Sequence, residues 1–452
     1  ALLNACKKGS IIPIFIFDAS IRQNGSASNI WLNYALESLN KSLNNKLVIL
    51  KGDTQDQLQK VIDMSKATGI FWNRVYEPQF MEYFSNLKKS LKNKGIEVFS
   101  YNSSLLIEPS KLLKNDGTPY KVFTPFYKKV LQHYFRKADS DKVKINIANH
   151  NIKSLKLEDL NLLPKKVDWH INLVKGWDIS ESGAHENLKI FIQNKLGDYK
   201  QARDFPNIEG TSILSPYLHF GQISPNQILE EVEQARDKTN SEGLECYISE
   251  IIWREFSYYL LYHFKSLPTG NFNSKFDNFK WQENKNLLKK WQQGQTGIPI
   301  VDAGMRQLYQ TGYMHNRVRM IVASLLVKNM LINWQEGLKW FENCLFDSDL
   351  ASNAASWQWV AGTGADAAPY FRIFNPTLQS EKFDKQGEYI KKYVPELKKI
   401  PAKYIHEPSK ISEQEALKLG FKKGVDYPNP IVDLKQSREQ ALEKYQEIKK
   451  AL

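Results

Sequence analysis

The sequence predicts an α/β domain followed by an all-helical domain. Residues 1–102 alternate short continuous apolar runs with amphipathic segments, which is the pattern of buried parallel strands covered by helices. From about residue 180 onward strand-like runs nearly vanish, and apolar residues recur at helical spacing to the end of the chain. The polar stretch between these regions contains four prolines, which is typical of a linker. We therefore expect a doubly wound parallel α/β domain over 1–102, an interdomain linker over 103–175 and a helical domain over 176–452.

The elements of the first domain follow from local patterns. Apolar runs such as IIPIFIFD predict strands, and the stretches between them carry apolar stripes at helical spacing. Thr54 is a plausible N-cap, and Gly95 ends a helix. No GxGxxG motif is present, so a Rossmann dinucleotide site is not supported. We expect strands within 11–18, 47–52, 70–75 and 96–102, and helices within 26–43, 54–69 and 77–95.

Composition excludes several classes of protein. No apolar run approaches the roughly 20 residues of a membrane span. The three cysteines form no CxxC pair, which argues against a zinc or iron–sulfur site of four thiolates and favours a reducing cytoplasm, with the nucleoid as the location in a bacterium. The net charge of +13 is compatible with a polyanionic partner. However, 51 lysines against 11 arginines would also result from an A/T-rich coding sequence, so charge alone leaves the question open.

Polar and aromatic residues are concentrated between positions 306 and 376. Four of the eleven arginines lie in this stretch, together with the motifs DSD and WQW. The segment MHNRVRMIVASLLVKNML (314–331) is amphipathic and predicts a helix. Its expected core stripe consists of Val318, Ile321, Val322, Leu325 and Leu326. Taken singly, the polar residues could be solvated charges, but their crowding around WQW indicates a functional site.

Two further segments have a functional and an ordinary interpretation. In GTSILSPYLHFGQISP (210–225), small hydroxyl residues precede helix-like segments and could bind a pyrophosphate, or could be N-caps. In the predicted helix 248–264, Glu250 lies four residues before Arg254, and Trp253 is between them. These side chains could contact a nucleic-acid base, or form a surface ion pair beside a core tryptophan.

The longest motifs identify a resemblance. EGTSILSPYL, SEIIWREF, GQTGIPIVDAGMRQLYQTGYMHNRVRM and DSDLASNAASWQWVAGTGADAAPYFRIFNP are specific, and the similarity extends from Ala1 to about Ala441. The chain resembles the class I photolyases, which repair cyclobutane pyrimidine dimers, within the photolyase and cryptochrome family. The resemblance implies light-dependent repair, with DNA containing these dimers as the partner, FAD as the cofactor, no metal, and a monomeric protein.

The resemblance assigns a set of residues to FAD. Arg319 and Asp347 would pair beside the isoalloxazine ring, where a guanidinium favours the reduced anionic flavin that repair needs. Asn353 would lie by the flavin N5 as a neutral amide, and Asp349 would bond to the ring edge. The phosphates and the rest of the cofactor would contact Tyr199, Thr211, Ser212, Ile213, Leu214, Ser215 and Ser348.

A second set would contact DNA. Glu250 and Asn316 would touch the polar edges of the thymines, and a carboxyl desolvated against indoles could be protonated and donate to the carbonyl that gains charge. The dimer must leave the duplex to be reached. Phosphate contacts position DNA without reading its sequence. The remaining expected DNA contacts are Trp253, Arg254, Arg317, Met320, Trp359, Arg372 and Lys382.

Three tryptophans match the family's electron relay. Trp357, Trp334 and Trp281 would pass electrons inward and reduce oxidised FAD under light. By themselves they could equally be three large core residues.

The chain departs from the family at its beginning. ALLNACKKG lacks the first strand and the Arg-Arg-Asp segment expected before it, which leaves the α/β domain without a central strand. In NDGTPY (115–120), Gly117 and Thr118 stand where the family has the acidic residue of a folate site. An antenna chromophore could therefore be a folate, a deazaflavin or a flavin, or be absent.

The rival function is that of a cryptochrome, a blue-light receptor without duplex repair. Plant cryptochromes have Asp where Asn353 stands and add a long tail, and the animal type has a paired-histidine pattern that MHNRVRM lacks. The DASH type, which favours single-stranded DNA, remains an alternative.

Overall fold

The computed structural model describes the chain except for residues 22–24, 134–143 and 451–452. It divides into two compact units that interleave along the sequence. The first unit comprises Ala1–Asn194, Ser212–Thr239 and Ile248–Lys265, and the second comprises Lys195–Thr211, Asn240–Tyr247 and Ser266–Leu452. Each unit is thus built from segments that are distant in the sequence.

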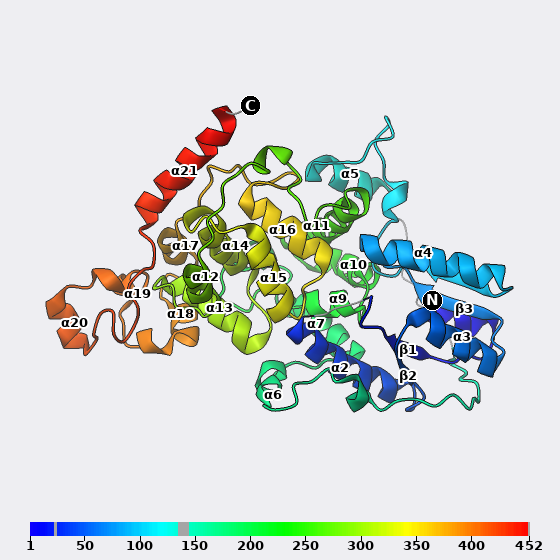
Figure 1. Ribbon diagram of the computed structural model, residues 1–452. Helices are drawn as coiled ribbons and strands as arrows, with labels where there is room; N and C mark the ends of the chain where they lie inside the picture. The colour runs from blue at the N-terminus through cyan, green and yellow to red at the C-terminus, as the bar shows by residue number, and fades with distance from the viewer. Residues whose placement is uncertain (22–24, 134–143, 451–452) are drawn as a thin grey trace. The chain divides into compact units, whose positions relative to one another are not determined.

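Four short strands belong to the first unit (Figure 1). Strand β1 (Ile14–Phe17) pairs with β2 (Val48–Lys51), and β3 (Gly69–Asn73) pairs with β4 (Glu97–Tyr101). Both pairs are parallel, which confirms the predicted strands and their direction. Within the described residues the four strands form two separate two-stranded sheets.

Helix α1 precedes β1, and helices α2 to α4 connect the four strands. Leu58 and Ile62 of α3 and Leu87 of α4 form a core cluster with Val98 of β4. The N-cap of α3 is Asp53, whose side chain accepts from the Asp56 N–H, so the predicted Thr54 cap is wrong. Thr54 is the first helical residue, and its hydroxyl bonds to a buried carboxylate at the end of β1 instead. The helix bounds are Leu2–Lys8 (α1), Ser26–Ser42 (α2), Thr54–Ser65 (α3) and Pro78–Asn93 (α4).

The segment 103–120, which we call the strap, is fixed to the last helix of the first unit. The Glu255 carboxylate on α11 accepts from the Leu106 and Ile107 N–H groups, each at 3.0 Å. One turn later, the Tyr259 hydroxyl donates to the Leu112 carbonyl at 2.6 Å. The helices in this part of the chain are α5 (Phe123–His133), α6 (Trp169–Val174), α7 (Glu181–Asn194), α9 (Ser215–Phe220), α10 (Pro225–Gln234) and α11 (Ser241–His263).

The named secondary-structure elements in the described part of the second unit are all helices, joined by loops. Helix α14 packs against α13, α16 and α17. All five residues of its predicted core stripe are buried, which confirms the amphipathic pattern. A π-helical turn, Leu325–Asn329, follows α14. The helices are α8 (Tyr199–Ala202), α12 (Lys285–Gln292), α13 (Pro299–Thr311), α14 (Asn316–Ser324), α15 (Trp334–Cys344), α16 (Leu350–Ala361), α17 (Pro376–Phe383), α18 (Glu388–Tyr393), α19 (Ala402–Ile405), α20 (Glu413–Leu419) and α21 (Leu434–Lys450).

Candidate active site

A bidentate ion pair lies at the centre of the second unit's polar cluster. Arg319 on α14 donates from Nη1 and Nη2 to the two oxygens of Asp347, at 3.0 and 2.8 Å, and from Nε to the Met314 carbonyl at 2.7 Å. The Asp347 side chain is only 4% exposed. Burial disfavours the charged guanidinium, but the attraction of Asp347 outweighs it and raises the pKa of Arg319. The site therefore holds a fixed, permanently charged guanidinium.

The start of α16 places three more predicted residues beside this pair. Asp349 is the N-cap, and its Oδ1 accepts from the Ser352 N–H at 2.8 Å. One turn later, the Asn353 amide donates from Nδ2 to the Leu338 carbonyl at 3.1 Å and to the Ser348 hydroxyl at 3.3 Å. These bonds set the orientation of the amide. The structure thus brings together the predicted residues of the DSD motif and the amide of Asn353.

Tyr313 connects this cluster to Thr211, and the sequence analysis did not select it. Its side chain hydrogen-bonds to Thr211, and its ring centroid lies 5.3 Å from Arg319 Cζ. The only sequence signal was its position in GYMHNRVRM, next to residues that were selected. The predicted Tyr199 is buried and makes an edge-to-face contact with Tyr247 at 5.2 Å.

His315 is a second residue to which the sequence patterns assigned no role. It is 5% exposed, and its Nδ1 accepts from the Arg317 N–H at 3.2 Å, which caps α14. Burial lowers the pKa of His315 to about 4, so the ring is neutral and its proton lies on Nε2. Within the described residues, Nε2 has no hydrogen-bond acceptor.

The other predicted phosphate-binding residues belong to the first unit. Ser212, Ile213 and Leu214 form the turn before α9, and Ser215 is its first residue. The cap position is occupied by Leu214, whose side chain makes no capping bond. Ile213 has φ 49°, an uncommon left-handed conformation for a β-branched residue. Such strain persists only where the surroundings impose it, and it is found preferentially at binding sites.

Glu250, Trp253 and Arg254 lie along α11. The Trp253 ring stacks on Phe123 with centroids 3.6 Å apart and an interplanar angle of 8°. Arg254 donates from Nη1 to the carbonyl of Ser104 in the strap at 2.7 Å. Both side chains therefore have structural contacts in addition to the DNA contacts expected of them. Glu250 is partly exposed.

The predicted DNA contacts of the second unit differ in how accessible they are. Asn316 is exposed at the start of α14, with the partly exposed Met320 one turn later. Arg317 is ion-paired with Asp204 at 2.7 Å and only 18% exposed. Its guanidinium carbon also lies 4.5 Å from the centroid of the Phe383 ring. Arg317 is therefore already engaged by protein, which its pattern in the sequence did not indicate.

The remaining predicted site residues are either exposed or partly exposed to solvent, or they belong to the tryptophan relay. Arg372 and Lys382 are exposed, and Trp359 on α16 is partly exposed. The relay tryptophans show a gradient of exposure that fits an inside-to-outside order. Trp357 and Trp334 are 2% and 1% exposed, whereas Trp281, the third predicted relay residue, is only partly buried.

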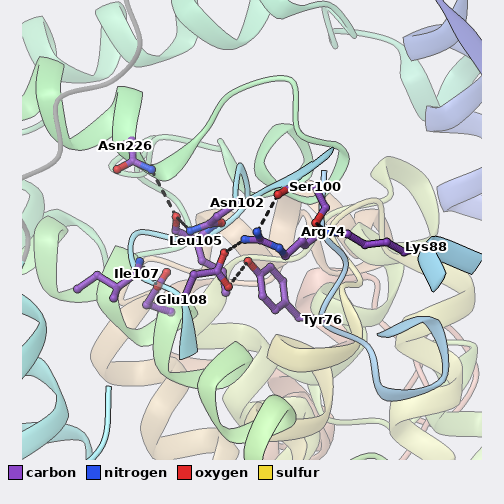
Figure 2. Close-up of polar contacts among 10 residues, drawn as sticks. Arg74, Tyr76, Lys88, Ser100, Asn102, Leu105, Ile107, Glu108 and Asn226 are labelled. Carbon is purple, nitrogen blue, oxygen red and sulfur yellow. Dashed lines mark hydrogen bonds and ion pairs between the residues drawn. The ribbon is translucent and has the colours of Figure 1, made fainter. Parts of the chain in front are cut away.

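The first unit contains a separate cavity of about 420 Å³ at the carboxyl ends of β3 and β4. Figure 2 shows Arg74 between the Glu108 carboxylate and the Ser100 carbonyl, to which it donates from Nη1 and Nη2. The strap also contributes Leu106, Ile107 and Leu112 to the lining, and the exposed Lys111 adds an ammonium. No sequence motif indicates this site, because its polar residues come from four separate segments of the chain.

No helix in the part of the chain that the structure describes is both long and apolar enough to cross a membrane. No group of three or more His, Cys, Asp or Glu side chains in that part of the chain could hold a metal ion.

Comparisons with known proteins agree with this geometry. Residues 247–447 match the model described as FAD binding domain of DNA photolyase, and residues 1–144 match DNA photolyase. The deoxyribodipyrimidine photo-lyase of Agrobacterium fabrum is 44% identical over 100% of this chain and 95% of its own length.

Three solved structures are similar over nearly the whole chain. A bacterial class III photolyase from Agrobacterium tumefaciens superposes with a TM-score of 0.94 at 43% identity, covering 99% of this chain and 94% of that one. A Synechocystis cryptochrome has a TM-score of 0.87 at 30% identity, covering 98% of this chain and 94% of that one. A Sulfolobus tokodaii photolyase described with two FAD molecules has a TM-score of 0.81 at 28% identity, covering 99% of this chain and 96% of that one. The expected class I subgroup is not confirmed, since the similar bacterial structure is of class III. The chain belongs to the photolyase and cryptochrome family.

Proposed function

We propose that this protein is a light-dependent DNA-repair enzyme that splits cyclobutane pyrimidine dimers with FAD as its essential cofactor. The observation that supports this best is the cluster of Arg319, Asp347, Asp349 and Asn353, in which a charged guanidinium, two carboxylates and an oriented amide converge. The photolyase names of the similar proteins agree with this proposal. The protein would act as a monomer in the cytoplasm, and on the nucleoid if it is bacterial.

The second unit fits a flavin because it contains a buried donor that an acceptor-rich ring could satisfy. His315 Nε2 is a buried N–H group without an acceptor among the described residues. FAD, when bound, would supply light absorption and the transfer of one electron to the dimer. The guanidinium of Arg319 would compensate the negative charge of the reduced ring, and Asp347 would hold that guanidinium in place. Asn353 would present a neutral amide to the ring.

On the substrate side, Glu250 and Asn316 would bond to the polar edges of the extruded dimer. Trp253, Trp359 and Met320 would contact its rings, with one face of the Trp253 indole already covered by Phe123. A carboxylic acid or amide placed there stabilises the carbonyl oxygen as charge develops on it. Thr211 and Ser212 to Ser215, with Tyr199, would hold the FAD phosphates.

Exposed cations would position the DNA backbone. Arg372 and Lys382 are free to reach phosphates, whereas Arg317 would have to exchange its pairing with Asp204. We therefore expect dimer-containing DNA to bind far more tightly than intact DNA, with both affinities falling as salt rises.

Two variants separate flavin reduction from repair. We expect Trp357→Phe, which keeps an aromatic of similar shape, to block photoreduction of the oxidised protein. After chemical reduction this variant should repair dimers at nearly the normal rate. Glu250→Ala should show the reverse, with normal photoreduction and slower repair. Loss of repair in dithionite-reduced Trp357→Phe protein that retains FAD would contradict this division of roles.

The same assay distinguishes repair from cryptochrome signalling. The similarity to a Synechocystis cryptochrome makes a photoreceptor the second candidate. A photoreceptor would be reduced by light through the tryptophans but would leave dimers in duplex DNA intact. Reversal of dimers in duplex DNA by the reduced protein under blue light supports the repair function, and reversal restricted to single-stranded DNA would support the DASH type.

We also propose that the cavity in the first unit accepts a second chromophore. Its volume of about 420 Å³ lies in the range of small-molecule sites, and ligands of α/β folds bind at the carboxyl ends of parallel strands. Apolar strap residues would cover an aromatic ring, and Lys111 would meet an acidic group. The Sulfolobus tokodaii photolyase described with two FAD molecules supports a second chromophore of this kind.

Reconstitution tests this second proposal. Purified protein is incubated separately with a folate, a deazaflavin and FMN, and the fluorescence of each is followed on binding. Leu106→Trp should fill the cavity and abolish binding of whichever chromophore is taken up. Equal binding to the wild type and to Leu106→Trp would place the chromophore elsewhere.

A further inference from the structure

The three relay tryptophans are all attached to the first turns of α15 or to the residues just before it. Trp334 is the first residue of α15. The Trp357 ring packs directly on Gly337, where an added Cβ would come within 2.1 Å of the indole. Trp281 is fixed near the same point, because the N–H of its neighbour Gln282 donates to the Leu331 carbonyl at 2.7 Å. The start of α15 is therefore a shared point of attachment for three indoles that come from α15, from α16 and from the segment before α12.

The hydrogen bonding of the two buried indoles differs. Trp357 Nε1 has no acceptor among the described residues. Trp334 Nε1 instead donates to the side-chain oxygen of Asn271 at 3.0 Å, and Asn271 Nδ2 donates in turn to the Asp277 carboxylate at 2.8 Å. An amide thus connects an exposed carboxylate to an indole that is 1% exposed.

The loop that presents Asn271 is held by the residue next to Trp357. Gln358 is fully buried, and its Nε2 donates to the carbonyls of Leu267 and Gly270 at 2.7 and 2.9 Å. Its Oε1 accepts from the Phe272 N–H at 2.8 Å. A buried side-chain amide is costly unless its groups are bonded, and here those bonds fix the backbone on both sides of Asn271.

Helix α15 holds the same loop from the other side. Gln335, which directly follows Trp334, donates from Nε2 to the Thr269 carbonyl at 2.7 Å. The position of the Asn271 amide is therefore set by α15 and α16, the two helices that contain the buried tryptophans. The bond from Trp334 to Asn271 therefore belongs to a network of hydrogen bonds that holds the loop, and it does not depend on the conformation of one surface side chain.

We propose that Asn271 and Asp277 make Trp334 easier to oxidise than Trp357, so that positive charge moves outward along the relay. This inference rests on the relay that the proposed function assigns to these tryptophans. Loss of an electron leaves a positive charge on the indole, and an acceptor on its N–H stabilises that charge. The Asp277 carboxylate polarises the amide and makes its oxygen a stronger acceptor. Trp357 has no such stabilisation.

The amide between the carboxylate and the indole keeps the charge mobile. When Trp334 gives one electron to oxidised Trp357, the indole N–H bond remains intact, because an amide oxygen is too weak a base to take the proton. One electron from Trp281 then restores Trp334, and a thiol reductant in the solvent restores Trp281. A carboxylate bonded directly to the indole would take the proton and trap the neutral radical.

Asn271→Leu tests the proposal, because leucine is similar in size but offers no acceptor. In transient absorption of the FAD-containing protein, the ratio of oxidised Trp357 to oxidised Trp334 should rise about tenfold, as expected for the loss of a hydrogen bond to a charged group. Asp277→Asn, at an exposed position, should shift the ratio in the same direction by a smaller factor.

A matched control exists in the first unit, where the buried Trp31 donates from Nε1 to Gln222 Oε1 at 2.8 Å. Gln222→Leu also deprives a buried indole of an amide acceptor, but outside the relay. It should leave the transient kinetics unchanged. A readout independent of the flavin is the ¹⁵N–¹H resonance of the Trp334 indole, which should move in Asn271→Leu with or without FAD.

The outcomes separate this inference from the relay itself. Normal photoreduction in Trp334→Phe would show that the assigned relay is wrong. If Trp334→Phe blocks photoreduction while Asn271→Leu and Asp277→Asn keep wild-type kinetics, the relay stands and the tuning proposal is overturned. An unmoved Trp334 resonance in Asn271→Leu would overturn it as well, because the bond would then not exist in solution.

Discussion

The structure contains two arginine–carboxylate pairs at two candidate ligand sites, and they are built differently. Arg319 and Asp347 join two helical segments of the second unit, with side chains 24% and 4% exposed. Arg74 and Glu108 join a strand end to the strap of the first unit, with side chains 42% and 19% exposed. The packing of the surrounding helices fixes the position of the first pair. The second pair borders an open cavity.

The difference in exposure implies that the Arg319–Asp347 pair is a fixed part of the folded structure, whereas the Arg74–Glu108 pair can rearrange. Breaking a buried pair leaves an uncompensated charge and is costly, whereas an exposed pair contributes little to stability. A site that must hold a cofactor in one geometry needs a buried, fixed pair. The exposed pair at the cavity can give up its own contact for contacts with a ligand.

The largest effect is expected from Asp347→Asn. It leaves the Arg319 charge without its partner, and should lower the free energy of unfolding by about 3 kcal/mol and abolish FAD retention. Chemical denaturation and flavin absorbance after gel filtration measure the two effects. Glu396→Gln is the matched control, because it removes the partner of Arg306 in another pair of the same unit, at 2.7 Å. The comparison fails if both variants keep FAD equally well.

Glu255, which fixes the strap to α11, should make the stability of the first unit depend on pH. Burial raises its pKa to about 7 from 4.5, against the effect of the two backbone N–H groups. A carboxyl with a raised pKa contributes stability at low pH that is lost as pH rises through about 7. Relative to Glu255→Gln, the wild type should lose on the order of 2–3 kcal/mol between pH 4 and pH 8. Denaturation series at both pH values measure this, and parallel curves would contradict it.

The exposed pair should be nearly neutral for stability. Glu108→Gln is expected to cost less than about 1 kcal/mol, because Arg74 remains in contact with water and with the Ser100 carbonyl. It should nevertheless change the affinity of the cavity for the chromophore that reconstitution identifies. A destabilisation as large as that of Asp347→Asn would show that the two pairs do not differ as proposed.

The smallest effect on stability is expected from the exposed cations of the second unit. Lys382→Ala and Arg372→Ala should leave unfolding unchanged, but each should reduce the slope of log affinity for duplex DNA against log salt by about 0.9. Lys41→Ala, which removes an exposed lysine of the first unit, serves as the control. An unchanged slope in Lys382→Ala would remove that residue from the phosphate contacts.

Local patterns predicted the elements of the fold. Apolar runs located all four strands, and helical periodicity located α14 and its buried stripe, because these features depend on neighbouring residues. The crowding of polar residues around DSD and WQW indicated a functional site, and the resemblance to the photolyase and cryptochrome family assigned Asp349 and Asn353 to it. The structure places both residues at the start of α16, where side chains one turn apart lie close together. Thr54 shows the limit of this reasoning, because its neighbour Asp53 was an equally suitable cap.

By itself, the sequence determined where the strands and helices lie, which faces they bury and which family the chain resembles. Only the tertiary structure decided the partners of the polar side chains. Arg317, expected to contact DNA, is paired with Asp204, and Trp253, expected to contact the dimer, stacks on Phe123. The same holds for the bond from Trp334 to Asn271. Periodicity encodes the local backbone and its buried face, whereas contacts between residues far apart in the chain arise only when the helices pack.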